Sequence, residues 1–179
     1  MTNEPVSIPE LLTEYDRALA YTESLWSGLT DDQWRWRPNE DSSAIGWHLG
    51  HQAAVAHFLV RNLIAAGPSP DPALDSIFDS AAALAERGDL PDRERLRAFR
   101  TDVAECVRAR LGAIESGHVG APEQLRVIGA GVLTAIVNHE YQHDQWIGEV
   151  RAGEFGLALP ARPVSGRLTV IDGYTVLSA

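Results

Sequence analysis

The chain has 179 residues, of which 45% are hydrophobic and 22% are charged, and its formal net charge is -10. This balance is typical of a folded globular protein of one domain and excludes a disordered chain. The acidic charge and the scattered basic residues argue against nucleic acid and against anionic membrane surfaces as partners.

The basic residues exclude two kinds of catalytic site, and the single cysteine indicates the cellular compartment. All fifteen basic residues are arginine, so a P-loop lysine and a Schiff-base lysine are excluded. Cys106 falls among the apolar positions of a helical pattern, and we expect a buried, reduced thiol in a cytoplasmic protein. The N-terminal residues show no secretory signal, and no apolar run reaches the roughly 18 residues that a membrane span needs.

The N-terminal segment predicts a long amphipathic helix. Ser7 and Glu10 form an S-x-x-E capping box, and apolar residues then recur with helical period as far as Leu29. The segment LTDDQWRWRPNEDSS that follows is rich in turn residues, so we expect a loop with one short helical turn. Its two tryptophans, Trp34 and Trp36, should pack back on the rest of the fold.

A second helix is predicted from Ser43, which we expect to be its N-cap, to Gly67 and Pro68, because the intervening residues are mostly apolar. The next segment, PSPDPALDSIFDS, indicates turns. A short helix is expected after it, at about 75–86.

Two further long helices complete an all-α four-helix bundle. Asp92 should open the third helix, which ends near Gly117, and Pro122 should open the fourth, which ends at Gly153. Four long helices in one small domain favour a bundle, and the connection over 68–91 is long enough to be a crossover.

The C-terminal residues follow a different pattern. Residues 168–171 and 174–177 have strand character and flank Asp172-Gly173, a favoured two-residue hairpin turn. We therefore expect residues 1–153 to form the bundle and residues 154–179 to be an extension of the same domain that carries a small β-hairpin.

The fourth helix carries HEYQH, whose two histidines, His139 and His143, are four residues apart. On a helix they lie about 40° apart around the axis and about 6 Å apart along it, on one face. That face continues an apolar stripe, so both rings should point into the bundle. Two unpaired imidazoles would be costly to desolvate there, and one metal ion would satisfy both.

The second helix offers candidates for a third metal ligand in WHLGH, where His48 and His51 are three residues apart on one side. The spacing does not choose between them. A three-histidine site leaves a coordination position open, which can activate water or a thiol. Zinc is the default for imidazole ligands, and nickel or iron(II) is compatible. His57 falls on another side and His118 lies in a loop, so we expect both to be exposed.

HEYQH also matches the H-E-x-x-H motif of zinc peptidases, in which Glu140 would be the general base. A third ligand should follow the motif, but only Glu149 and Glu154 are available and no histidine comes after His143. No strand precedes the motif to hold an extended peptide. A peptidase is therefore disfavoured, and we interpret Glu140 as a carboxylate on the helix surface or beside the ligands.

WHLGH paired with HEYQH, together with the loop LTDDQWRWRPNEDSSAIGWHLGHQAA, resembles the DinB-like superfamily over most of the chain. That superfamily includes a bacillithiol-transferase-like group and the mycothiol-dependent maleylpyruvate isomerases. The resemblance implies a four-helix bundle, commonly a homodimer, with a divalent metal held by three histidines. These positions match His51, His139 and His143 here, which would leave His48 as a pocket residue or one that supports a ligand.

The resemblance also implies a function. It favours a metal-dependent enzyme, an S-transferase or isomerase that uses a low-molecular-weight thiol such as mycothiol or bacillithiol and an electrophilic substrate. Gln145 stands where the related sulfoxide synthases have glutamate, which argues against oxygen-dependent chemistry. A non-catalytic metal- or ligand-binding bundle and a metal-dependent hydrolase remain as alternatives.

Overall fold

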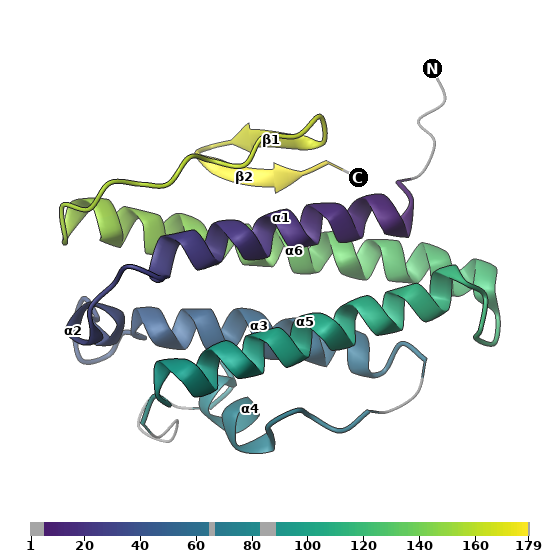
Figure 1. Ribbon diagram of the computed structural model, residues 1–179, viewed down its shortest axis with the longest axis horizontal. Coiled ribbons are helices and arrows are strands. Elements are labelled where there is room, and N and C mark those ends of the chain that lie inside the picture. The colour runs from purple at the N-terminus through teal and green to yellow at the C-terminus, as the bar shows by residue number, and fades with distance from the viewer. Residues whose placement is uncertain (1–5, 65–66, 83–88, 179) are drawn as a thin grey trace.

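The computed structural model describes residues 6–64, 67–82 and 89–178. Within these ranges the chain forms six helices and one two-stranded antiparallel sheet (Figure 1). The elements are α1 (Ile8–Trp26), α2 (Asp31–Arg35), α3 (Ile45–Arg61), α4 (Pro72–Phe78), α5 (Arg93–Glu115), α6 (Pro122–Gly153), β1 (Leu168–Ile171) and β2 (Tyr174–Leu177).

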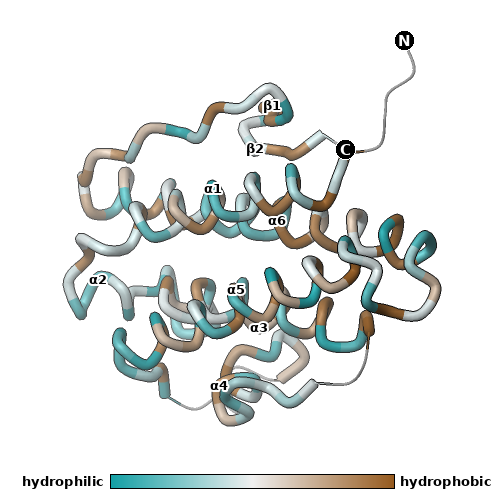
Figure 2. The backbone as a smooth tube through the Cα atoms, turned by 45° about the vertical axis from the view of Figure 1, so that its right-hand side comes forward, coloured by the Kyte–Doolittle hydropathy of each residue, from teal (hydrophilic) through white to brown (hydrophobic). Residues whose placement is uncertain are grey.

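The four long helices form the predicted bundle in two pairs. α1 packs along α6, and α3 packs along α5 and also contacts α6 (Figure 1). The short helix α4 lies against α3, and the hairpin lies against α6 through β2. Hydrophobic and hydrophilic segments alternate along the long helices (Figure 2), as amphipathic helices around a common core require.

The core between the helices is filled by large apolar side chains. Its largest fully buried members are Trp26, Trp34, Tyr15, Tyr141, Phe78, Leu11, Leu25, Ile45, Leu49, Leu74, Leu96 and Leu111. Cys106 packs against this core but is only partly buried. No helix within the described ranges combines the length and the apolar character that crossing a membrane requires.

Several helix ends follow from their caps as predicted. The Ser7 hydroxyl accepts from the Glu10 N–H, and the Glu10 carboxylate accepts from the Ser7 N–H at 3.1 Å, so the capping box of α1 is complete. Asp92 caps α5 by accepting from the Arg95 N–H at 2.7 Å. Pro122 occupies the first turn of α6, where its missing N–H costs nothing.

The start and end of α3 differ from the prediction. Its N-cap is Ala44 rather than Ser43, because the Trp36 carbonyl accepts from the Ile45 N–H and so serves the first turn in place of a side chain. The helix ends at Arg61, several residues before Gly67. The apolar residues beyond it, Leu63 and Ile64, still pack against the core from a turn. Hydrophobic pattern alone does not separate these two conformations.

The short helix in the crossover also lies earlier than expected. α4 begins at Pro72 and ends at Phe78, whereas the prediction placed a helix at about 75–86; residues 83–86 of that range lie outside the described residues. The Asp71 carboxylate accepts from the N–H groups of Ala73 and Leu74. What resembled a turn was therefore the N-cap and the N-terminal proline of a helix.

The loop helix and the hairpin agree with the prediction. α2 is a five-residue helix that buries Trp34, and the Trp36 ring packs edge-on against Phe155. Asp172 and Gly173 have φ of 51° and 90°, the positive values that a type I′ hairpin turn requires.

The hairpin is tied to α6 by a side chain next to the histidines. The Asn138 side chain accepts from the Leu177 N–H at 2.7 Å, and its amide donates to the Leu177 carbonyl at 3.5 Å. Leu177 itself is buried. β2 is thereby held on the turn of α6 that carries the first histidine of HEYQH.

Candidate metal centre

Three histidines from two helices converge between α3 and α6. One ring nitrogen of each of His51, His139 and His143 lies within 4.8 Å of the other two. His51 is buried, and the two α6 histidines are partly exposed. The histidine cluster therefore lies in the wall of the bundle and not at its centre. A small molecule can reach it there.

The spacing of the two α6 histidines suits a shared ion. Their Nε2 atoms are 3.1 Å apart. Two nitrogens bound to one tetrahedral zinc at about 2.1 Å would be separated by about 3.4 Å. The ring centroid of His51 is 5.2 Å from each of theirs, at interplanar angles of 66° and 76°. The three rings thus converge edgewise instead of stacking.

His51 is oriented by the end of α4. Its Nδ1 lies 2.8 Å from the Phe78 carbonyl, which can only accept, so Nδ1 carries the proton and Nε2 the lone pair. The Trp47 ring stacks on His51 at 4.6 Å and donates its own N–H to the Ile77 carbonyl at 2.8 Å. Metal-binding histidines commonly have such a carbonyl on the far nitrogen.

A glycine allows α4 to approach α3 this closely. A Cβ at Gly50 would lie 2.1 Å from the Phe78 ring, well inside contact distance. The glycine of WHLGH therefore makes room for the residue whose carbonyl holds His51.

The environment favours the neutral form of the two α6 imidazoles. Burial, and then the neighbouring His139, His48 and His51, lower the pKa of His143 to about 3. Burial and then His51 also lower the pKa of His139. Neutral imidazoles present lone pairs, which is the state that a metal requires.

His48 contacts His143 on the side of the ring that faces away from His139. Its Nδ1 lies 2.8 Å from Nδ1 of His143, the nitrogen that does not face His139. Its ring also packs against Trp146, with centroids 4.2 Å apart. Of the two α3 candidates that the spacing left open, His51 joins the cluster and His48 touches one of its members.

The two motifs that meet in this site, WHLGH and HEYQH, both lie within the residues that one family model matches. A family model described as the DinB superfamily matches residues 14–147. The chain belongs to the DinB superfamily. No curated protein matches the chain.

Directly beside the histidines, this DinB-superfamily protein has a buried polar network that joins four helices. The Arg100 guanidinium of α5 forms an ion pair with Glu140 of α6 and donates to Gln52 of α3. The Thr22 hydroxyl of α1 contacts Glu140 at 2.8 Å and Asp144 at 2.9 Å, and the Gln52 amide donates to Asp144 at 3.0 Å. All five side chains are buried.

The surroundings of Asp144 in this network favour its protonated form. Burial, and then the charge of Glu140, raise the pKa of Asp144. A protonated Asp144 can donate to the Thr22 oxygen, which leaves the single hydroxyl proton of Thr22 for another acceptor. The partner of Arg100 in the ion pair is Glu140. One proton shared in this way avoids two buried anions side by side.

The structure corrects one prediction about a member of this network, Glu140. The network itself was not predicted from the sequence. Glu140 is 2% exposed, so the surface alternative of its prediction was wrong, and the alternative that places it beside the ligands stays a prediction. Its burial follows from the ion pair with Arg100, which compensates the carboxylate inside the bundle. The available signals were Glu140 and Asp144 four residues apart, each next to a histidine of α6, and Gln52 within the apolar run of α3.

The last two histidines have different surroundings. His118 is exposed, as predicted. His57 is only 1% exposed, so the prediction that it faces solvent was wrong. α4 and the segment before it lie over that side of α3, and Asp75 and Pro68 face the ring. Burial lowers the pKa of His57, which keeps this ring neutral.

Proposed function

We propose that this protein is a metal-dependent enzyme whose divalent ion is held by His51, His139 and His143. The observation that supports the proposal is the convergence of three imidazole nitrogens, from two helices, within 4.8 Å of one another. This donor set suits zinc, and nickel or iron(II) is also compatible. Three protein ligands leave at least one position for an exchangeable group.

The reaction we propose is an S-transfer or isomerisation that uses a low-molecular-weight thiol, mycothiol or bacillithiol, and an electrophilic small molecule. A divalent ion at this site would lower the pKa of a bound thiol and so favour the nucleophilic thiolate. Membership of the DinB superfamily and the open coordination position support this choice. A cytoplasmic homodimer is part of the proposal.

The neighbouring residues have positioning roles in this proposal. The Phe78 carbonyl fixes the tautomer of His51, and His48 accepts the Nδ1 proton of His143 so that Nε2 faces the cluster. Burial raises the pKa of Asp144 and so favours its uncharged form beside the ligands, and Glu140 is paired with Arg100.

The position of Glu140 weighs against a zinc peptidase. A general base must be able to accept a proton from a metal-bound water. Here the Glu140 carboxylate is paired with Arg100 and contacted by Thr22, away from solvent. A metal-dependent hydrolase and a non-catalytic bundle are the two alternatives that experiment has to separate from this proposal.

Elemental analysis of the purified protein tests the metal site. We expect about one equivalent of zinc, nickel or iron in the wild type, and a loss of at least about tenfold in affinity when His139→Ala removes one ligand. His118→Ala is the matched control, because His118 is an exposed histidine outside the cluster. Equal and negligible metal in all three proteins would reject the site.

Turnover assays separate an enzyme from a binder. The metal-loaded protein is assayed with mycothiol, bacillithiol and glutathione against a panel of electrophiles, with His51→Ala as the inactive reference. Thiol consumption that requires both the metal and His51 supports the proposed reaction. Stoichiometric metal without turnover of any pair would favour the non-catalytic bundle, and turnover of esters or amides without thiol would favour the hydrolase.

A further inference from the structure

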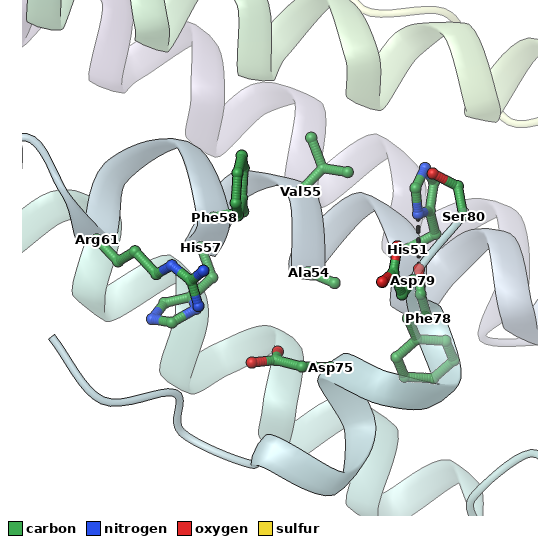
Figure 3. A pocket seen from close by; sticks show the side chains of 10 residues that line it. All are labelled: His51, Ala54, Val55, His57, Phe58, Arg61, Asp75, Phe78, Asp79 and Ser80. Carbon is green, nitrogen blue, oxygen red and sulfur yellow. Dashed lines mark hydrogen bonds between the residues drawn. The ribbon is translucent and has the colours of Figure 1, made fainter. Parts of the chain in front are cut away.

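A cavity of about 350 Å³ lies beside the histidine cluster, between α3 and α4. Its volume is in the range that holds small-molecule ligands. Figure 3 shows Arg61 at one end of the cavity and His51 at the other. The Cα atoms of these two residues are separated by about 15 Å along the axis of α3. The cavity therefore extends along α3 from an arginine to a member of the histidine cluster.

The wall that α3 contributes between these two ends is apolar. Ala54, Val55 and Phe58 line it (Figure 3), and Phe58 is 58% exposed. No other charged residue of α3 precedes Arg61. The carbon body of a ligand would remove this apolar surface from water, which favours binding.

Arg61 has no carboxylate partner in the part of the chain that the structure describes. Eight other arginines form ion pairs within the same ranges. The Arg61 guanidinium lies over the Phe58 ring at 5.0 Å, and the residue is partly exposed. A guanidinium that rests on an aromatic ring keeps the N–H groups of its edge as donors. A ligand in the cavity can therefore reach a positioned guanidinium.

The charges at this end of the cavity favour an anion. Burial is the main cause that lowers the pKa of His57, and Arg61 and Arg110 lower it as well, whereas Asp75 acts in the opposite direction. Two guanidiniums and one carboxylate therefore lie near this ring, and a neutral ring adds no charge, so one positive charge is in excess. The other carboxylate of the cavity, Asp79, lies at the far end (Figure 3).

A carboxylate is the anion that matches these features. Its two oxygens accept from the planar fork of one guanidinium, and its single charge equals the excess at this end. A carboxylate on a carbon body also suits a cavity that has an apolar wall next to its cationic end.

We propose that this cavity binds an elongated organic carboxylate, with the carboxylate group on Arg61 and the carbon body along Phe58 and Val55. The other end of the ligand then points toward His51. That such a ligand is a substrate of the ion held there rests on the proposed function. Carboxylate binding itself does not depend on the metal.

Calorimetric titration of the purified protein with phenylbutyrate tests the proposal, and phenylbutyramide serves as its uncharged analogue with the same carbon body. We expect phenylbutyrate to bind at least about fivefold more tightly, because only the carboxylate pairs with the guanidinium. Arg61→Gln should remove this preference. Arg35→Gln is the matched control and should keep it, because Arg35 also lies over an aromatic ring, that of Trp34 at 5.2 Å, but does not line the cavity.

The salt dependence of binding is a second readout. The chain has a formal net charge of -10, so salt that only screens the overall repulsion of an anion would tighten the binding of phenylbutyrate. Pairing with Arg61 predicts the opposite sign. Between about 0.02 M and about 0.5 M sodium chloride, phenylbutyrate should lose at least about twofold in affinity relative to phenylbutyramide.

Four results would overturn the proposal. Phenylbutyrate and phenylbutyramide could bind the wild type equally, Arg61→Gln could retain the preference, Arg35→Gln could lose it, or neither compound could bind. Circular dichroism and melting curves verify that each variant folds. If Arg61→Gln does not fold, the sign of the salt dependence decides the question.

A control distinguishes this site from the metal site. In His139→Ala, which lacks a proposed metal ligand, phenylbutyrate should bind as it does to the wild type. Binding that disappears in His139→Ala but survives in Arg61→Gln would show that the carboxylate coordinates the metal, and the proposal would be rejected. Absence of metal from the wild type would reject the proposed function and leave carboxylate binding at Arg61 intact.

Discussion

The imidazole of His51 is held in place by protein groups alone. The Phe78 carbonyl binds Nδ1, and the Trp47 ring covers one face. The first contact depends on how closely α4 approaches Gly50, and the Trp47 N–H is bonded to the Ile77 carbonyl of the same short helix. A ligand that is oriented in advance loses less freedom when it binds an ion, so this packing should raise metal affinity.

The substitution Gly50→Ala tests that dependence. The added methyl group would meet the Phe78 ring at 2.1 Å and displace α4, so we expect a loss of about 1–3 kcal/mol in the free energy of unfolding, together with weaker metal binding. Urea denaturation and metal titration measure the two effects. Gly112→Ala is the control: its Cβ meets nothing within 4 Å on α5, so this change should stabilise by about 0.5–1 kcal/mol. A Gly50→Ala protein that matches wild type in both measurements would contradict this account.

His57 makes stability depend on pH. Burial lowers its pKa in the folded state below the ordinary value of about 6.5, with Arg61 and Arg110 acting in the same direction and Asp75 and Pro68 opposing them. The unfolded chain then binds more protons below about pH 6.5, so the contribution of His57 to stability is lost as the pH falls through that value.

Urea midpoints at pH 7.5 and pH 5.5 measure this effect in the metal-free protein. We expect the loss of stability between the two pH values to be smaller in His57→Gln than in the wild type. His118→Gln should behave like the wild type, since His118 is exposed. An unchanged pH dependence in His57→Gln would show that the ring is not kept neutral by burial.

At the scale of elements, the buried polar network sets how the helices pack against one another. Arg100 reaches from α5 to Glu140 on α6 and to the Leu49 carbonyl on α3, while Thr22 brings in α1. The network lies one residue away from each α6 histidine in the sequence. It therefore fixes the rotation of α6 that turns those histidines toward α3.

Removing Arg100 should be costly because a buried carboxylate would lose its partner. We expect Arg100→Met to reduce the free energy of unfolding by about 3–5 kcal/mol. Arg108→Met is the matched control on the same helix, because Arg108 pairs with Asp16 at the surface and should contribute only about 0–1 kcal/mol. Chemical denaturation of both proteins provides the comparison, and equal losses would mean that the network adds no specific stability.

The sequence predicted the elements best where caps and periodicity agree. The starts of α1, α5 and α6 follow from Ser7, Asp92 and Pro122, and the hairpin follows from Asp172-Gly173. The limits of α3 and α4 were wrong because apolar residues pack from turns as well as from helices, and because Pro72 can start a helix as well as a turn.

The histidine cluster could be anticipated only in part. Four-residue spacing places His139 and His143 on one face, but spacing leaves His48 and His51 open, and the prediction of His51 depends on the resemblance to the DinB-like superfamily. The Phe78 carbonyl that orients His51 is a contact over 27 residues, which no local pattern encodes. The ion pair of Glu140 was not predicted. Its partner Arg100 is 40 residues away in the sequence, and pairs formed across the bundle leave no periodic signal.

At the scale of the whole molecule, the histidine cluster lies between the two helix pairs. α6 belongs to one pair and α3 to the other (Figure 1). The cluster therefore takes His139 and His143 from one helix pair and His51 from the other. An ion that binds the folded state and not the unfolded chain stabilises the fold according to its concentration relative to its dissociation constant.

Thermal melting measures that linkage. Zinc at 100 times its dissociation constant should add about 2.7 kcal/mol to the free energy of unfolding of the wild type, and a chelator should remove the gain. His139→Ala should show neither response, whereas His118→Ala should show both. A melting temperature that does not respond to zinc in the wild type would contradict ion binding between the pairs.

The position of the ligands has a consequence for local opening. Residue 51 and residues 139 and 143 lie far apart in the sequence, so an ion shared by them would act as a cross-link between two distant segments. Neither segment could then separate from the other without breaking a coordinate bond. Amide hydrogen exchange should slow in both segments together when the ion is present, and chelation should speed both together.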